Sequence, residues 1–204
     1  MKRTTSFRFL LVSRVLLAGL AWSGGATPVV FAASFTVNTQ SDTHDVNPGD
    51  GQCADADGNC SLRAAIEESN ALPGFPPVVI TLPSGTYVLT LGELEVKKSL
   101  DLNGAGSNFT FIDGNNSSRV FAVNGATNQI VHFFGVTIRN GNGGSFVSGG
   151  GIFIVDGAYL ALSNSVVRDN KGMQFGGGIS NAGALQILNS TIQDNSRGIT
   201  ESCG

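Results

Sequence analysis

The chain has 204 residues, with 12 Lys and Arg against 15 Asp and Glu and a formal net charge of −3 at pH 7. Four of the basic residues fall within the first 32 positions, so the rest of the chain carries 12 − 4 = 8 basic and 15 acidic groups, near −7. This acidic balance argues against nucleic acid or an anionic membrane surface as the partner, because both are bound through clustered Lys and Arg.

Residues 1–32 have the pattern of a secretory signal peptide. Basic residues flank the start of an apolar run at 15–22, and the small residues that follow predict cleavage after Ala32, with Ala26 as the alternative. An uncleaved membrane anchor is a second interpretation, but residues 23–25 interrupt the apolar run, which is short for a bilayer. We therefore expect an exported protein, secreted or held at a cell surface, with no membrane insertion after cleavage.

Residues 33–77 form the expected N-terminal unit, which precedes the repeats. Alternating apolar and polar residues at 34–39 predict a first strand, and the polar residues that follow predict a loop. In an oxidising compartment, Cys53 and Cys60 are expected to form a disulfide that closes part of this loop. Cys203 is then left without a partner.

A short helix is predicted to follow the disulfide loop. Ser61 is expected to cap a helix from Leu62 to about Ala71, with one narrow apolar face. Arg63 and Glu67 are expected to pair across one turn of this helix. We expect the helix to cover the N-terminal end of the repeats, because an open first coil would expose its core and an unpaired strand edge.

Residues 78–204 show an internal repeat of short apolar segments separated by Gly and Asn. The sequence GGGI occurs at 149–152 and again at 176–179, and each copy is followed by a related line of apolar pairs. A looser copy at 131–140 fits the same frame one coil earlier. This spacing is typical of a solenoid whose neighbouring coils complete each other's core, and it predicts an all-β parallel β-helix with three short strands per coil.

Stacked coils would place equivalent polar residues beside one another. Asn164 is expected beside Asn189, and Asn170 beside Asn195, as structural ladders whose amides satisfy backbone groups at the corners. The sequence stops in mid-coil at 197–204, so we expect it to be a truncated reading frame or a fragment.

The segment Cys60–Ile66, CSLRAAI, resembles the motif of the CSLREA-domain family of exported bacterial proteins. The likeness starts at Gly49–Cys53 (GDGQC) and continues through Ile80–Tyr87 (ITLPSGTY) and Leu102–Gly106 (LNGAG) into the glycine repeats. The resemblance implies a pectate-lyase-like right-handed β-helix in a bacterial extracellular or outer-membrane location. It implies no common activity.

Two further comparisons of motifs qualify this resemblance. Ala64 stands where the family has Glu, so only the Ser61 half of a capping box remains and the motif has a structural meaning. The glycine repeats also resemble in part those of chlamydial polymorphic outer-membrane proteins, which combine GGA-type blocks with Phe-x-x-Asn. Here Phe35–Asn38 and Phe121–Asn124 match the second element but do not alternate with GGGI.

Asp169 and Asp194 are the candidate catalytic residues. In the repeat register they stack about 5 Å apart, a separation that suits a retaining glycosidase, and Arg168 beside Arg139 could bind an acidic sugar. An Asp that precedes Asn at a strand end is also an ordinary corner residue, and this second interpretation is favoured.

Asp55, Asp57 and Asn59 are the candidate calcium ligands. They resemble the start of a calcium loop, but the Gly falls at the fourth position instead of the sixth and no Glu closes the loop. A solvated acidic turn held by the disulfide is therefore favoured over a calcium site, and no other cofactor is expected.

The remaining motifs point to no reaction. His44 and His132 are isolated in the sequence, so zinc has no support, and no GxSxG nucleophile elbow is present. We expect a structural or adhesive protein that binds an extracellular polysaccharide or cell-surface polymer through a long regular face. The alternatives are a polysaccharide lyase or glycoside hydrolase acting on the outer face, and a nonfunctional fragment.

Overall fold

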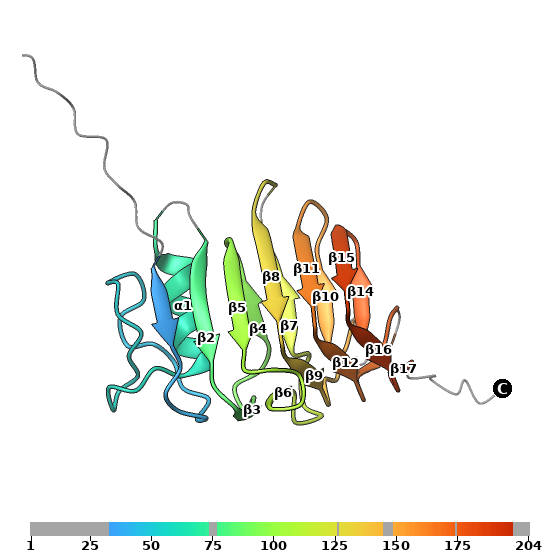
Figure 1. Cartoon of the computed structure of the whole chain (residues 1–204), viewed down its shortest axis with the longest axis horizontal. Helices are drawn as coiled ribbons and strands as arrows, with labels where there is room; N and C mark the ends of the chain where they lie inside the picture. The colour runs from blue at the N-terminus through green and yellow to red at the C-terminus, as the bar shows by residue number, and fades with distance from the viewer. Residues whose placement is uncertain (1–32, 74–76, 126, 145–148, 174, 198–204) are drawn as a thin grey trace, which may run out of the picture.

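The computed structural model describes residues 33–73, 77–125, 127–144, 149–173 and 175–197. The expected signal peptide and Cys203 lie outside the described residues. The described chain is a parallel β-solenoid with one short helix, and Figure 1 shows its strands side by side along a single axis.

Three parallel sheets run along the solenoid. Sheet A contains β1 (Ser34–Thr36), β2 (Val78–Leu82), β5 (Leu100–Gly104), β8 (Ile130–Phe134), β11 (Tyr159–Ser163) and β15 (Ala184–Leu188). Sheet B contains β3 (Gly85–Val88), β6 (Thr110–Asp113), β9 (Thr137–Arg139), β12 (Val166–Arg168) and β16 (Thr191–Gln193). Sheet C contains β4 (Leu94–Val96), β7 (Phe121–Val123), β10 (Ile152–Ile154) and β14 (Ile179–Asn181), and a short sheet D pairs β13 (Lys171–Gly172) with β17 (Ser196–Arg197).

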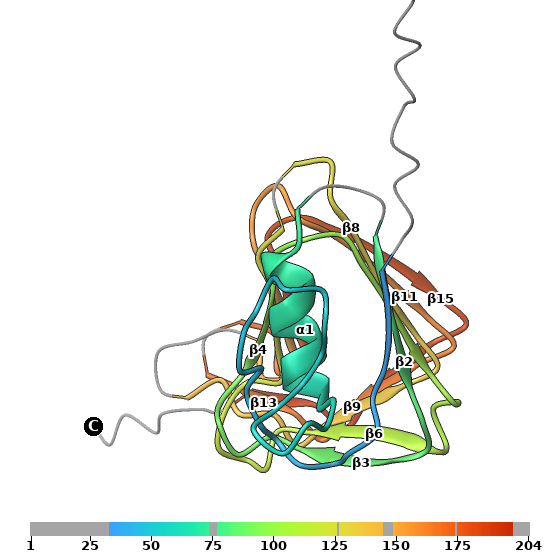
Figure 2. The same cartoon turned by 90° about the vertical axis from the view of Figure 1, so that its left-hand side faces the viewer.

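Each coil passes through sheets A, B and C in that order. Seen from the N-terminal end, β2, β3 and β4 follow one another clockwise while the chain recedes from the viewer, so the solenoid is right-handed (Figure 2). Equivalent residues of neighbouring coils are register partners, as Val131, Leu160 and Leu185 show. The predicted all-β, right-handed parallel β-helix with a short N-terminal helix is confirmed.

The core consists of apolar side chains that point inward from all three sheets. Leu102, Phe133 and Leu162 occupy one register column of sheet A and are fully buried. The ring of Phe133 lies 4.5 Å, between centroids, from the ring of Phe121 in sheet C. Because each inward column continues from coil to coil, every coil buries its side chains against the coils on both sides.

The GGGI repeats allow a close approach of neighbouring backbones where sheet D meets sheet C. A Cβ atom on Gly150 would lie 2.3 Å from the carbonyl oxygen of Lys171, and one on Gly177 would lie 2.2 Å from that of Ser196. Both distances are far below van der Waals contact. These repeats therefore have a steric function at this corner.

Asn170 and Asn195 form a hydrogen-bonded ladder. The Nδ2 atom of Asn170 donates to the carbonyl of Ile138 in the preceding coil (3.1 Å) and to Oδ1 of Asn195 in the next (2.9 Å), while its Oδ1 accepts from the amide of Gly141 (2.8 Å). The Nδ2 atom of Asn195 repeats the first of these bonds with the carbonyl of Val167 (2.9 Å). One buried side chain thus links three coils.

Helix α1 (Leu62–Ala71) lies over the N-terminal end of the solenoid (Figure 2). Ser61 adopts an extended conformation and its hydroxyl oxygen accepts from the amide of Ala64 at 3.0 Å, which is N-cap geometry. The predicted pairing of Arg63 with Glu67 is wrong. Arg63 bonds Asp42 and Glu67 bonds His44, because the loop that precedes α1 folds back along the helix and supplies closer partners.

Candidate functional site

A groove of about 380 Å³ crosses the outer face of sheet A. Because strands of a parallel sheet are spaced about 4.8 Å apart, a groove that crosses four strands extends roughly 14 Å along the solenoid axis. Its lining comes from four successive coils, and the residues are Asp101 of β5, Ile130 and His132 of β8, Tyr159, Ala161 and Ser163 of β11, and Gln186 and Leu188 of β15.

Asp101, His132 and Ser163 form a polar line across this groove. Asp101 and His132 are register partners, and Ser163 lies two residues along β11 from Ala161, the partner of His132. Residues two apart on a strand share a face, so all three side chains project outward. The Nε2 atom of His132 lies 2.9 Å from Ser163 Oγ, and its Nδ1 atom lies 3.9 Å from Asp101 Oδ1.

Apolar and aromatic side chains occupy the groove beside this polar line. Ile130 is 56% exposed and Leu188 is 48% exposed, which is high for such side chains on a sheet face. The hydroxyl of Tyr159 donates to Oε1 of Gln186 at 2.9 Å, and this bond holds both side chains across neighbouring coils. Large exposed apolar side chains beside oriented polar groups are typical of a binding surface.

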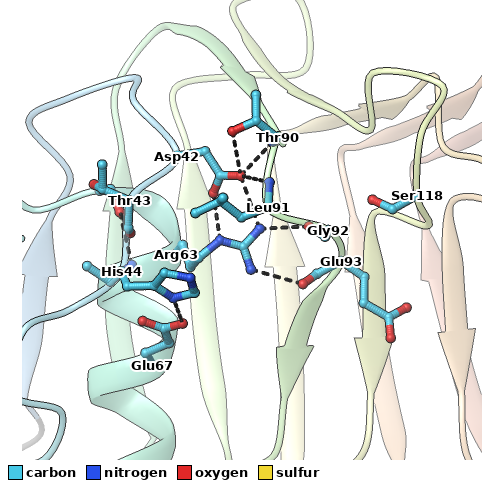
Figure 3. A network of polar contacts seen from close by, with 12 residues as sticks. Asp42, Thr43, His44, Arg63, Glu67, Thr90, Leu91, Gly92, Glu93 and Ser118 are labelled. Atoms are coloured by element: carbon cyan, nitrogen blue, oxygen red, sulfur yellow. Dashed lines mark hydrogen bonds and ion pairs between the residues drawn. The ribbon is translucent and has the colours of Figure 1, made fainter.

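A second hollow, of about 480 Å³, lies where α1 meets the β3–β4 connection, but its polar groups are occupied structurally. The guanidinium of Arg63 bonds Asp42 through Nε at 2.7 Å and the carbonyls of Gly92 and Glu93 at 2.7 and 3.1 Å. Figure 3 shows Arg63 between these partners, with His44 bonded to Glu67 beside it. This network fixes α1 on the solenoid.

The buried carboxylate of Asp42 is ionised in this network. Burial opposes its charge, but the hydrogen bond from Arg63 and the backbone amides of Leu91 (2.7 Å) and Thr90 (2.6 Å) outweigh that effect and lower the pKa of Asp42. Its side chain is 3% exposed and that of Arg63 is 7% exposed. The pair is therefore a buried structural ion pair.

The structure places Asp169 and Asp194 at a corner of the coils. Their φ angles are 55° and 52°, and Asn140, the equivalent residue one coil earlier, has a φ of 53°. Asn and Asp adopt this left-handed conformation at low cost, which accounts for both residues without catalysis. Arg168 bonds the carboxylate of Asp169, while Arg139, its register partner, bonds Asp113 at 2.8 Å.

The other predicted ladder pair, Asn164 and Asn189, lies at the corner between sheets A and B. Both residues have a φ of 48°, and the position one coil earlier is Gly135, with a φ of 66°. The amide of Asn164 donates to the carbonyl of Leu188 at 3.0 Å. Gly135, Asn164 and Asn189 share one property, which is that each adopts the left-handed conformation at low cost.

The loop that carries Asp55, Asp57 and Asn59 is held by local bonds. Asp55 Oδ1 accepts from the amides of Asp57 (3.0 Å) and Asn59 (2.8 Å), and Oδ2 accepts from the hydroxyl of Thr43 (2.8 Å). The amide of Asn59 and the Thr43 hydroxyl lower the pKa of Asp55. Within the described part of the chain, no group of three or more His, Cys, Asp or Glu could hold a metal ion.

The predicted disulfide between Cys53 and Cys60 is present. It joins the loop to the residue just before the Ser61 cap, so the acidic turn and the start of α1 are covalently tied.

No protein-family model, no curated protein and no solved structure matches the chain. Over the described residues, no helix is both long and apolar enough to cross a membrane. The class of the molecule therefore follows from its architecture: it is a right-handed parallel β-solenoid with a groove on sheet A.

Sequence reasoning missed the polar line of the groove. His132 is isolated in the sequence, and its neighbours Asp101 and Ser163 lie 31 residues away on either side. The signal was the repeat frame: once 131–140 is aligned with the later copies, His132 occupies an outward position next to the column of Ser163. Separations close to the coil length identify such contacts in a solenoid.

Proposed function

We propose that this protein is an exported, surface-associated β-solenoid that binds an extracellular glycan along the outer face of sheet A. The observation that carries the proposal is the groove itself, which runs along the solenoid axis and combines Tyr159 with a polar line. The role is structural or adhesive, because a regular face adds many weak contacts along an extended polymer.

The chemistry of the groove suits a neutral or weakly polar glycan. A sugar ring has an apolar face that packs on an aromatic ring and hydroxyls that need hydrogen-bond partners. Tyr159 supplies the aromatic surface, and Asp101 and Gln186 supply acceptor and donor groups at opposite ends of the groove. A protein with a net negative charge is a poor receptor for a polyanion, so uncharged glycans are the favoured ligands.

Two further observations support the exported setting. Disulfides persist in oxidising compartments, and the Cys53–Cys60 bond ties the loop to the helix cap. The segment Cys60–Ile66, which runs from the end of this loop into α1, resembles CSLREA-domain proteins, and this likeness points to a bacterial surface. Fractionation of producing cells tests this part: the chain is expected in the medium or the outer-membrane fraction, and a cytoplasmic location would contradict it.

The glycan proposal is tested by binding of the purified chain to a panel of plant and bacterial polysaccharides. Substitution Tyr159→Ala is expected to weaken binding roughly tenfold, which corresponds to about 1.4 kcal/mol for the lost aromatic contact. Phe109→Ala is the matched control, because Phe109 is an exposed aromatic residue that does not line the groove. Binding that survives Tyr159→Ala, or that both variants weaken equally, would remove the groove from the proposal.

A further inference from the structure

We propose that Ser163 is an acyl-accepting nucleophile, with His132 as its general base and Asp101 as the charge that stabilises the imidazolium. The substrate class is a small O-acyl ester, such as an acylated sugar hydroxyl. This activity uses the same groove but does not depend on glycan affinity, because a small aryl ester suffices to reveal it.

The order of the three side chains carries the inference. His132 lies between the other two and uses different ring nitrogens for them: Nε2 is 2.9 Å from Ser163 Oγ, and Nδ1 is 3.9 Å from Asp101 Oδ1. A nucleophile within hydrogen-bond reach of a base, with a carboxylate on the far side of that base, is the arrangement that activates a serine. It is recognised by geometry and not by fold or sequence order.

The tautomer of His132 follows from the charge beside it. A carboxylate near Nδ1 favours the tautomer that carries its proton on Nδ1, so Nε2 is left as an acceptor. The hydroxyl of Ser163 makes no other hydrogen bond to the described residues, and its proton is therefore directed at Nε2. At 3.9 Å, which is beyond hydrogen-bond distance, Asp101 acts on the imidazolium through its charge.

The surroundings of Ser163 can hold a small acyl group. Ser163 is only 8% exposed and is reached through the groove that it lines. Ala161 leaves space next to it, while Ile130 and Leu188 provide an apolar wall. Among the groove residues, Gln186 has an amide that can donate to an oxyanion, and its Oε1 is already held by Tyr159.

The reaction balances with water as the only co-reactant. Ser163 Oγ attacks the carbonyl carbon and its proton passes to His132 Nε2; the ester C–O bond then breaks, and the departing alkoxide takes that proton as it leaves. Water attacks the acyl-serine, His132 accepts one of its protons and returns it to Ser163 Oγ, and the carboxylic acid is released. No oxidation or reduction occurs.

The test combines p-nitrophenyl acetate hydrolysis with fluorophosphonate labelling of the purified full chain, followed by peptide mass mapping. The label is expected on Ser163. Ser163→Ala should abolish it, and His132→Gln should slow hydrolysis by on the order of 100-fold, because the general base is lost. Asp101→Asn should slow it about fivefold, as expected for a charge about 4 Å away in a hydrated site.

Two further variants keep the test decisive. Ser107→Ala is the matched control, since Ser107 is a partly exposed serine that lies outside the groove and whose backbone carbonyl accepts from the Thr137 hydroxyl, and it should leave both readouts unchanged. Ser163→Cys retains a nucleophile and should be alkylated by iodoacetamide faster than the same variant that also carries His132→Gln. Unlabelled Ser163, or equal hydrolysis by the parent chain and Ser163→Ala, would overturn the proposal even if glycan binding is intact.

Discussion

The two ends of the solenoid differ in how their last apolar residues are covered. At the N-terminal end, α1 lies across the first coil, and Ile66 and Ala65 on its inner face are buried with the core. At the other end, Ile187 and Ile192 are 43% and 42% exposed, whereas Leu162 and Val167, their register partners one coil earlier, are fully buried. The same side-chain position is therefore core or surface according to whether another layer covers it.

The largest expected effect comes from breaking the buried ion pair between Asp42 and Arg63, which holds α1 on the first coil. Asp42→Asn leaves the Arg63 charge buried without its counter-ion, and we expect a loss of about 3–5 kcal/mol in the free energy of unfolding, measured by urea denaturation. Lys97→Ala, which removes an exposed pair with Glu95, is the control and should cost about 0–1 kcal/mol. Equal losses would mean that the network does not fix α1.

A second test uses one column of sheet A at two coils. Leu162→Ala should lower the free energy of unfolding by about 2–5 kcal/mol, because it leaves a cavity between two coils. Ile187→Ala should cost clearly less, since its side chain is already partly in water. If the two substitutions lower the free energy of unfolding equally, Ile187 must be covered by another layer in solution.

Acid should lower the stability of the folded chain through Asp42 and Asp55, which both lie at its N-terminal end. The pKa values of Asp42 and Asp55 are lowered in the folded chain, so the unfolded chain takes up protons first as the pH falls. The stability that these carboxylates contribute is complete above their ordinary pKa of about 3.9 and is lost as the pH falls toward the folded values. The urea concentration at the unfolding midpoint should therefore fall once the pH is lowered past about 4. In the Asp42→Asn variant this midpoint should fall less over the same pH range.

The smallest expected effect is at the helix cap itself. Ser61→Ala removes the acceptor for the amide of Ala64 and should cost about 1 kcal/mol. Thermal unfolding monitored by circular dichroism measures it, with Ser41→Ala in the exposed loop as a neutral comparison. An effect as large as that of Asp42→Asn would assign a further role to the Ser61 hydroxyl, which also donates to the carbonyl of Thr43.

Much of the fold could be predicted because the spacing of its repeated motifs can be read directly along the sequence. The copies of GGGI and of the Asn-Ser line fixed the coil length, and the capping serine and Pro73 fixed the helix bounds. The predicted Arg63–Glu67 ion pair was wrong because the rule that residues four apart on a helix form a pair applies to exposed side chains. Arg63 is instead buried, where a loop carboxylate and two carbonyls compete successfully for its guanidinium.

The candidate groove was less accessible to sequence reasoning for a different physical reason. Its polar line is assembled across three coils, so no local motif contains it. Only the outward or inward direction of each strand residue, together with the coil register, brings His132 to Ser163. The repeat copy at 131–140 matches the later copies only loosely, so the sequence alone does not give the register of His132.

The Asn170–Asn195 ladder gives this architecture a simple way to change length. Each of these amides bonds the coil before it, and Asn170 also bonds the coil after it, so a coil that carries such a residue can be joined to another without a new interface. Duplication or loss of one unit, 27 residues between the glycine blocks or 25 between the Asn-Ser pairs, would preserve every ladder contact. Natural variants of such a chain should thus differ by whole coils, and the reach of the sheet A face would change in steps of one strand spacing.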